Sequence, residues 1–171
     1  NGALLNPAQK EQLRKLDEDL SKLGPHFNDN VLKATNAFEL WIKDEQELAG
    51  LPDSAREAAA HAASEKGQPG WLFSLDGPSY LAFMKYSDLR EYREKMWRAY
   101  TTRCVGGPFD NLELIKKIVS LRHQRANLLG YPTHADFVLK KRMAESPQIV
   151  NSFLERLLQV SKPAAQMEIA E

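Results

Sequence analysis

The sequence is poor in the residues that bind metal ions and form disulfides. It contains one cysteine, Cys104, among 171 residues, which excludes an internal disulfide framework and a zinc site built from thiolates. An H-E-x-x-H helix places two imidazoles four residues apart on one zinc ion. Glutamate follows none of the four histidines, which are His26, His61, His123 and His134. We therefore assign no catalytic, cofactor-binding or metal-binding residue in this chain.

Net charge and long apolar runs are also absent. The 23 basic and 23 acidic side chains cancel, so no electrostatic field gathers nucleic acid or anionic lipid. The chain shows no charged leader before an apolar run and no stretch of about 18 apolar residues. It has no Gly-x-Ser-x-Gly elbow, and Gly106-Gly107-Pro108 is no phosphate loop because it ends in a residue without an N–H. We expect neither a nucleic-acid nor a membrane partner.

What the chain does contain is a strong helical pattern. Its 43% hydrophobic and 27% charged residues are enough to bury a core. Asn6-Pro7-Ala8-Gln9 indicates a helix start with proline in the first turn. Apolar residues then recur in steps of three and four, at Leu13, Leu16, Leu20, Leu23, Phe27, Val31, Ala34 and Phe38. The stripe stays in phase across Gly24-Pro25, so it predicts a continuous helix kinked there, although proline favours a break.

Two short segments have the pattern of β-strands. Phe38 to Lys43 alternates apolar and polar residues, and Trp71 to Leu75 is an apolar run that ends before Gly77-Pro78. Because a lone strand leaves its backbone unpaired, we expect the two to form an antiparallel ribbon. Further helix starts are indicated at Asp44-x-x-Glu47, Ser54-x-x-Glu57 (a helix to Lys66), Asp88-x-x-Glu91, Asp110-x-x-Glu113, Thr133-x-x-Asp136 and Ser146-Pro147. The predicted fold class is mainly α, multi-helical, with one small two-stranded antiparallel ribbon.

Six segments, in this order and spacing, resemble one family of enzymes. They are Asn28 to Pro52, ending in Glu-Leu-Ala-Gly-Leu-Pro; Trp71 to Tyr80, ending in Pro-Ser-Tyr; Arg90 to Tyr100, ending in Arg-Ala-Tyr; Leu121-Arg122-His123; Leu128-Leu129-Gly130-Tyr131; and Ala135 to Leu139 with Met143-Ala144. The family is that of peptidyl-dipeptidase, oligopeptidase A and thimet oligopeptidase, which are zinc metallopeptidases. The resemblance spans about Leu13 to Pro163. Ala-Phe-Glu-Leu-Trp, at 37–41, is most similar to the dipeptidyl carboxypeptidase branch.

The resemblance implies a parent enzyme that hydrolyses short peptides with a zinc-bound water, activated by the glutamate of an H-E-x-x-H motif. This chain would lie upstream of that motif. We expect residues 1–171 to form a single helical segment of the upstream half, to wall the substrate channel, and to be inactive alone. Zinc would belong to the parent, with no cofactor in this segment. The chain starts at Asn1 and stops inside a helical pattern after Pro163, which favours a piece of a longer protein.

The implied partners follow from the same resemblance. They are short peptide substrates of the parent and the missing catalytic half of the same chain, and the excised segment is expected to self-associate. The expected compartment is the cytoplasm, or the periplasm if the parent carries a signal peptide. The alternative from another class is a self-contained helical protein-interaction module.

Three local clusters each have two interpretations. One cluster alternates cations with aromatic residues, as nucleic-acid-binding surfaces do. Its cations are Arg90, Arg93, Lys95, Arg98 and Arg103. We favour an amphipathic helix with Glu91–Lys95 and Glu94–Arg98 pairs and a core stripe of Leu89, Tyr92, Met96 and Tyr100.

The other two clusters lie further along the chain. His123 with Arg122 and Arg125 could contact a peptide carboxylate, but ion pairs between helices are favoured. Lys140-Lys141-Arg142 resembles a localisation signal in composition alone, and we favour the exposed face of a helix whose apolar side is Phe137, Leu139 and Met143. Cys104 is expected to be a buried or half-buried apolar residue.

Overall fold

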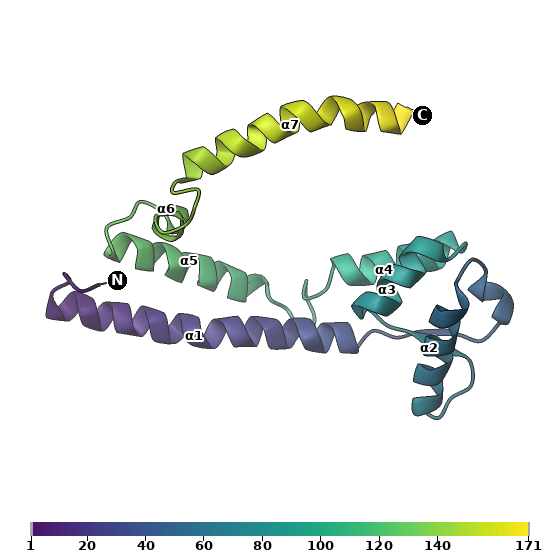
Figure 1. Cartoon of the computed structure of the whole chain (residues 1–171). Helices are drawn as coiled ribbons and strands as arrows, with labels where there is room; N and C mark the ends of the chain where they lie inside the picture. The colour runs from purple at the N-terminus through teal and green to yellow at the C-terminus, as the bar shows by residue number, and fades with distance from the viewer. Residues whose placement is uncertain (1, 171) are drawn as a thin grey trace. The chain divides into compact units, whose positions relative to one another are not determined.

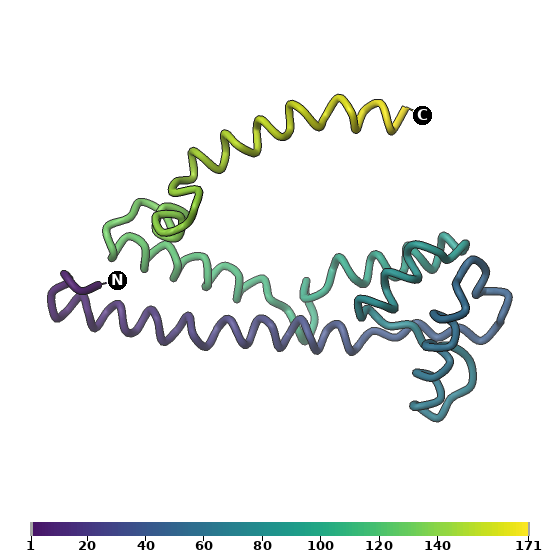
Figure 2. Tube along the Cα trace, viewed as in Figure 1, coloured from purple at the N-terminus to yellow at the C-terminus, as the bar shows by residue number. Residues whose placement is uncertain are grey.

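The fold is mainly α-helical, with one antiparallel ribbon within the described part of the chain. A computed structural model describes residues 2–170 (Figures 1 and 2). Its elements are α1 (Pro7–Asn36), β1 (Leu40–Ile42), the 3-10 helix η1 (Glu45–Leu48), α2 (Asp53–Glu65), β2 (Trp71–Phe73), α3 (Gly77–Tyr86), α4 (Arg90–Thr101), α5 (Leu112–Leu128), α6 (His134–Leu139) and α7 (Pro147–Ala170). The predicted fold class is confirmed.

The chain divides into two compact units. The first, here the ribbon unit, is Gly24–Ile115 and holds the ribbon with η1, α2, α3 and α4. The second, here the terminal unit, combines Asn1–Leu23 with Lys116–Glu171 and holds α6 and α7. Within residues 2–170, none of the helices combines the length and apolar character that a membrane crossing needs.

Helix α1 begins and continues as its sequence predicts. Asn6 and Gln9 exchange hydrogen bonds at its start, with Gln9 N donating to Asn6 Oδ1 at 2.9 Å and Asn6 N donating to Gln9 Oε1 at 3.1 Å. The helix runs through Pro25 without a break. The continuous helix predicted from the apolar stripe is therefore confirmed, although proline favours a break. Every residue of that stripe is buried or half-buried. The bend expected at Gly24-Pro25 stays a prediction.

The predicted ribbon is present, with strands shorter than the alternating segments. Leu40 pairs with Phe73, Trp41 with Leu72 and Ile42 with Trp71 in antiparallel register. Gly70 precedes β2 with a φ of +105°, and a Cβ there would lie 2.5 Å from the carbonyl oxygen of Ile42. Only glycine accepts both the positive φ and this close approach.

The hydrophobic core lies in the ribbon unit. It is formed by residues from β1, η1, α2, β2, α3 and α4 and from the loops that follow η1 and β2, namely Leu40, Ile42, Leu48, Leu51, Ala59, Phe73, Leu75, Phe83 and Met96. Phe73 and Phe83 meet edge to face with ring centroids 4.8 Å apart. Half-buried Tyr80 and Tyr100 stack at 4.1 Å beside this core. Helices α3 and α4, which follow the ribbon in the sequence, therefore pack against it and stabilise it.

A buried pair of amides adds a polar link inside the ribbon unit. Asn30 Nδ2 donates to Asn111 Oδ1 at 2.9 Å, and Asn111 Nδ2 donates to the carbonyl oxygen of Phe27 at 3.1 Å. Both asparagines are buried. Because unpaired buried amides are costly, the two side chains hold α1 in register against the residue that precedes α5.

Candidate functional site

Within residues 2–170, no three His, Cys, Asp or Glu side chains gather closely enough to hold a metal ion. His26, His61 and His123 are exposed, and His134 is half-buried. His61 Nδ1 lies 3.8 Å from Glu65 Oε1 on the same helix, a contact that is an ion pair only when the histidine is protonated.

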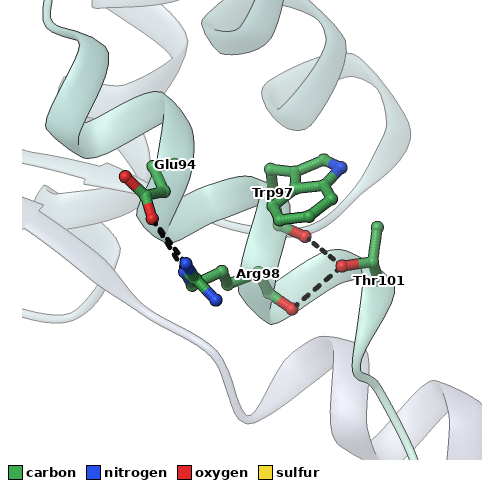
Figure 3. A network of polar contacts seen from close by, with 4 residues as sticks. All are labelled: Glu94, Trp97, Arg98 and Thr101. Carbon is green, nitrogen blue, oxygen red and sulfur yellow. Dashed lines mark hydrogen bonds and ion pairs between the residues drawn. The ribbon is translucent and has the colours of Figure 1, made fainter.

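Arg98, on the cationic side of α4, is held by contacts within the helix. Arg98 donates through Nε and Nη2 to Glu94 Oε1 at 2.9 and 2.7 Å, and Thr101 Oγ1 donates to the carbonyl oxygens of Trp97 and Arg98 (Figure 3). Met96 on the opposite side is fully buried, and Tyr92 packs against the core. The amphipathic interpretation and the predicted Glu94–Arg98 pair are confirmed, whereas the Glu91–Lys95 pair stays a prediction.

Arg103, just after α4, is also held inside the ribbon unit. Its Nη1 donates to Thr35 Oγ1 at 2.9 Å, its Nε donates to the carbonyl oxygen of Tyr100 at 3.0 Å, and its guanidinium carbon lies 3.8 Å from the centroid of the Tyr100 ring. The guanidinium therefore stacks on one ring and donates hydrogen bonds to both α1 and α4, which fixes these two segments relative to each other within the ribbon unit. The neighbouring Cys104 is half-buried as predicted, and burial raises the pKa of its thiol.

Arg125 likewise links helices within the terminal unit. Its Nε donates to Asp17 Oδ1 of α1, and its guanidinium lies 4.9 Å from the centroid of the Phe137 ring of α6. The ion-pair interpretation is confirmed for Arg125, whereas Arg122 and His123 are exposed. Nδ1 of His134 is buried and has no hydrogen-bond partner among the described residues. Burial, followed by the positive charges of Arg122 and Arg125, lowers the pKa of His134.

The prediction for residues 140–143 was partly wrong. Lys140, Lys141 and Arg142 are exposed as expected, but α6 ends at Leu139 and they lie in turns rather than on a helix. Met143 is 101% exposed and lies beyond the end of α6, so it forms no part of the apolar side of that helix. Glu145, with a φ of +59°, adopts the left-handed conformation in the turn that leads into α7.

The ribbon unit contains a groove of about 630 Å³, here called the ribbon groove. Its lining comes from the end of α1, the two residues before β1, α2, β2, the start of α3 and the loops that follow α2 and β2: Asn36, Phe38, Glu39, Ala55, Ala58, Ala59, Ala62, Glu65, Lys66, Leu72, Phe73, Ser74, Asp76, Pro78 and Ser79. Glu39 pairs with Lys66 and accepts from Trp41 Nε1 at 2.8 Å. The hydrogen bond from Lys66 lowers the pKa of Glu39 most, followed by the bond from Trp41. The carboxylate therefore stays charged.

Helix α7 carries a second surface, here called the α7 surface. None of its described residues is buried, and eight of its large apolar side chains are at least 46% exposed: Ile149, Phe153, Leu154, Leu157, Leu158, Val160, Met167 and Ile169. Met143, Ile149, Val150 and Phe153 also line an open apolar hollow of about 640 Å³ at the start of the helix. Exposed apolar surface this extensive marks a binding or packing face.

Comparison with known proteins identifies the class to which this architecture belongs. Residues 83–171, just over half of the chain, match peptidase family M3. The chain belongs to that family. The resemblance stated from the sequence is confirmed at this level, and the matched part includes α4 and the whole of α7.

The similar proteins include oligopeptidase A of Haemophilus influenzae, which is 40% identical over the whole of this chain and 26% of its own length. Probable cytosolic oligopeptidase A of Arabidopsis thaliana is 36% identical over the whole chain and 25% of its own length. Dipeptidyl carboxypeptidase of Escherichia coli is 30% identical over 99% of the chain and 25% of its own length. The chain thus spans about a quarter of these relatives. The identities favour oligopeptidase A over the dipeptidyl carboxypeptidase branch that residues 37–41 suggested.

Proposed function

We propose that this chain is a non-catalytic helical part of a zinc-dependent metallopeptidase that hydrolyses short peptides. The observation that carries the proposal is the match of residues 83–171 to peptidase family M3. The relatives are named as oligopeptidases and a dipeptidyl carboxypeptidase, and the chain spans about a quarter of their length. Its four histidines do not form an H-E-x-x-H motif. Zinc would therefore be bound by residues outside this chain.

The role that we propose for residues 1–171 is architectural, as part of an upstream helical half that walls the substrate channel. The α7 surface supports this role, because its exposed leucines, isoleucines and phenylalanine have the composition of a buried helix. Family membership extends through α7, so its apolar side chains belong to a segment that the family shares. We infer that the remaining catalytic half of the same polypeptide covers this surface. A cytoplasmic location is proposed with it, in line with the name of the Arabidopsis relative.

A self-contained helical interaction module is the second candidate function. It is favoured by one observation, the core within residues 24–115, which includes the fully buried side chains Phe83 and Met96. The parent reading frame separates the two candidates. An H-E-x-x-H motif a few hundred residues downstream supports the peptidase, whereas a stop codon soon after Glu171 contradicts it.

The direct test is a comparison of zinc content and peptide hydrolysis. The purified 171-residue chain is expected to contain no stoichiometric zinc by atomic absorption and to leave internally quenched peptides uncleaved. The longer parent protein is expected to contain about one zinc ion and to lose its turnover with a chelator. Stoichiometric zinc in the 171-residue chain, with chelator-sensitive turnover, would refute the proposal.

A further inference from the structure

The ribbon groove has the shape of a site for an extended chain. One wall runs from Ala55 of α2 to Lys66, the residue that follows the helix, and at 1.5 Å per residue it is about 16 Å long. An extended peptide advances about 3.4 Å per residue, so about five residues fit along this wall. A volume of about 630 Å³ lies in the range of pockets that bind small ligands.

The floor and walls of the groove are apolar. Leu72 and Phe73 of β2 are buried beneath it, and Phe38 adds a half-buried ring at its side. Ala55, Ala58 and Ala62 recur on one face of α2 in steps of three and four, and their methyl groups leave the space open. A peptide side chain that enters this space exchanges water for apolar neighbours.

The rim of the groove is acidic. Its charged residues are Glu39, Glu65 and Asp76 against Lys66 alone, which gives a formal charge of −2. Lys66 is already paired with Glu39. Asp76 Oδ2 accepts one hydrogen bond from Ser74 Oγ at 2.9 Å, and a carboxylate has capacity for several more. The charge on the rim therefore complements a cationic ligand.

We propose that the ribbon groove binds an extended peptide segment in which apolar side chains alternate with lysine or arginine. Successive side chains of an extended chain point to opposite sides, so the apolar residues can all enter the groove. The basic side chains start on the outer side, and they are long enough to bend back to the carboxylates of the rim. The inference deepens the proposed function by naming a class of peptide. Its test measures binding without hydrolysis, so its failure leaves the zinc and turnover test unaffected.

The test uses three fluorescein-labelled, end-blocked peptides and the 171-residue chain, with binding followed by fluorescence anisotropy. The probes are Leu-Lys-Leu-Lys-Leu, its acidic counterpart Leu-Glu-Leu-Glu-Leu, and Ser-Lys-Ser-Lys-Ser. We expect the first to bind with a Kd below about 1 mM and each of the others to bind about tenfold more weakly, because one lacks the charge match and the other lacks the apolar contacts. Equal binding of the acidic peptide, or no binding of the first at millimolar concentration, overturns the proposal.

Variants locate the binding site. Ala58→Leu fills the groove and is expected to weaken binding of Leu-Lys-Leu-Lys-Leu about tenfold, whereas Ser64→Leu, on an exposed part of α2 outside the lining, leaves it unchanged. Leu157→Glu disrupts the α7 surface and is also expected to leave it unchanged. Binding that survives Ala58→Leu, or that is lost in Leu157→Glu, contradicts the assignment to the ribbon groove. Far-UV circular dichroism confirms that each variant is folded.

Charge variants test the rim separately. The double variant Glu65→Gln/Asp76→Asn keeps the shape of the groove and removes two carboxylates. It is expected to weaken the basic peptide about three- to tenfold at low salt and to reduce the salt dependence of binding. Glu57→Gln, on the same helix but outside the groove lining, is the matched control and is expected to change the affinity less than twofold. Equal effects of both changes would overturn the role given to the rim.

Discussion

The ribbon unit and α7 present similar side chains in opposite situations. In the ribbon unit, Phe83 and Met96 are 0% exposed, whereas in α7 Phe153 is 50% and Leu157 is 46% exposed. Both regions are helical, and both carry apolar residues at helical spacing. The difference is that the ribbon unit supplies its own partners from β1, β2 and four helical elements. Periodicity therefore tells which face of a helix is apolar, but the rest of the fold decides what covers it.

The largest expected effect separates these two regions directly. Phe83→Ala removes a ring that packs edge to face against Phe73, and it should lower the free energy of unfolding by about 3–5 kcal/mol. Phe153→Ala, the matched change in α7, should alter it by less than about 0.5 kcal/mol in dilute monomeric protein. Urea unfolding followed by far-UV circular dichroism checks both values. Equal losses would mean that α7 is already packed.

The buried amide pair sharpens the account of the ribbon unit. Asn111→Ala leaves the Asn30 amide and the Phe27 carbonyl without these hydrogen bonds, which should cost about 1–3 kcal/mol in the free energy of unfolding. The double variant Asn30→Ala/Asn111→Ala should lose less than the sum of the two single variants, because they share one interaction. Additive losses in urea unfolding would show that the pair is not coupled.

A smaller effect is expected at the start of α6 in the terminal unit. Thr133 Oγ1 accepts from Asp136 N at 3.2 Å and Thr133 N donates to Asp136 Oδ2 at 3.1 Å, which forms a capping box. Thr133→Ala should lower the free energy of unfolding by about 1 kcal/mol, and Thr133→Ser should restore most of it. A serine variant as unstable as the alanine variant would contradict the role of the hydroxyl group.

The smallest effect concerns the pH dependence of the terminal unit. The pKa of His134 is lowered in the folded state by burial and by Arg122 and Arg125, so the unfolded state binds the proton more readily. The stability contributed by neutral His134 is fully present above its usual pKa of 6.5 and is lost as pH falls through the lower folded value. Thermal unfolding between pH 5 and 8 should show a weaker pH dependence for His134→Gln, with exposed His123→Gln as the control. A loss of pH dependence in His123→Gln instead would contradict the assignment.

Local sequence signals predicted much of this fold. The pairs Asn6/Gln9 and Thr133/Asp136 cap helices as expected, and Asp44 caps η1 by accepting from Gln46 N at 2.9 Å. Each of these signals acts over two or three residues, where chain geometry alone fixes the contact. The paired strands were predictable because a lone strand must find a partner.

Helix α3 was not predicted, because Gly77-Pro78 was interpreted only as the end of a strand. Proline in the first turn also starts helices, and that signal could have identified it. The ribbon groove was missed for a different reason. Its lining joins residues 36–39, 55–66 and 72–79, which come together only through the register of the ribbon and the packing of α2. No sequence pattern within one segment encodes that arrangement.

The measurement that most directly tests the central claim is the mass of the 171-residue chain by light scattering at several protein concentrations. Because the α7 surface leaves eight large apolar side chains exposed, we expect masses above the 19.4 kDa monomer that increase with concentration. The double variant Phe153→Glu/Leu157→Glu should shift the mass back to the monomer. A chain that stays strictly monomeric at every concentration would contradict the claim that the α7 surface is made to be covered, and would favour the self-contained interaction module.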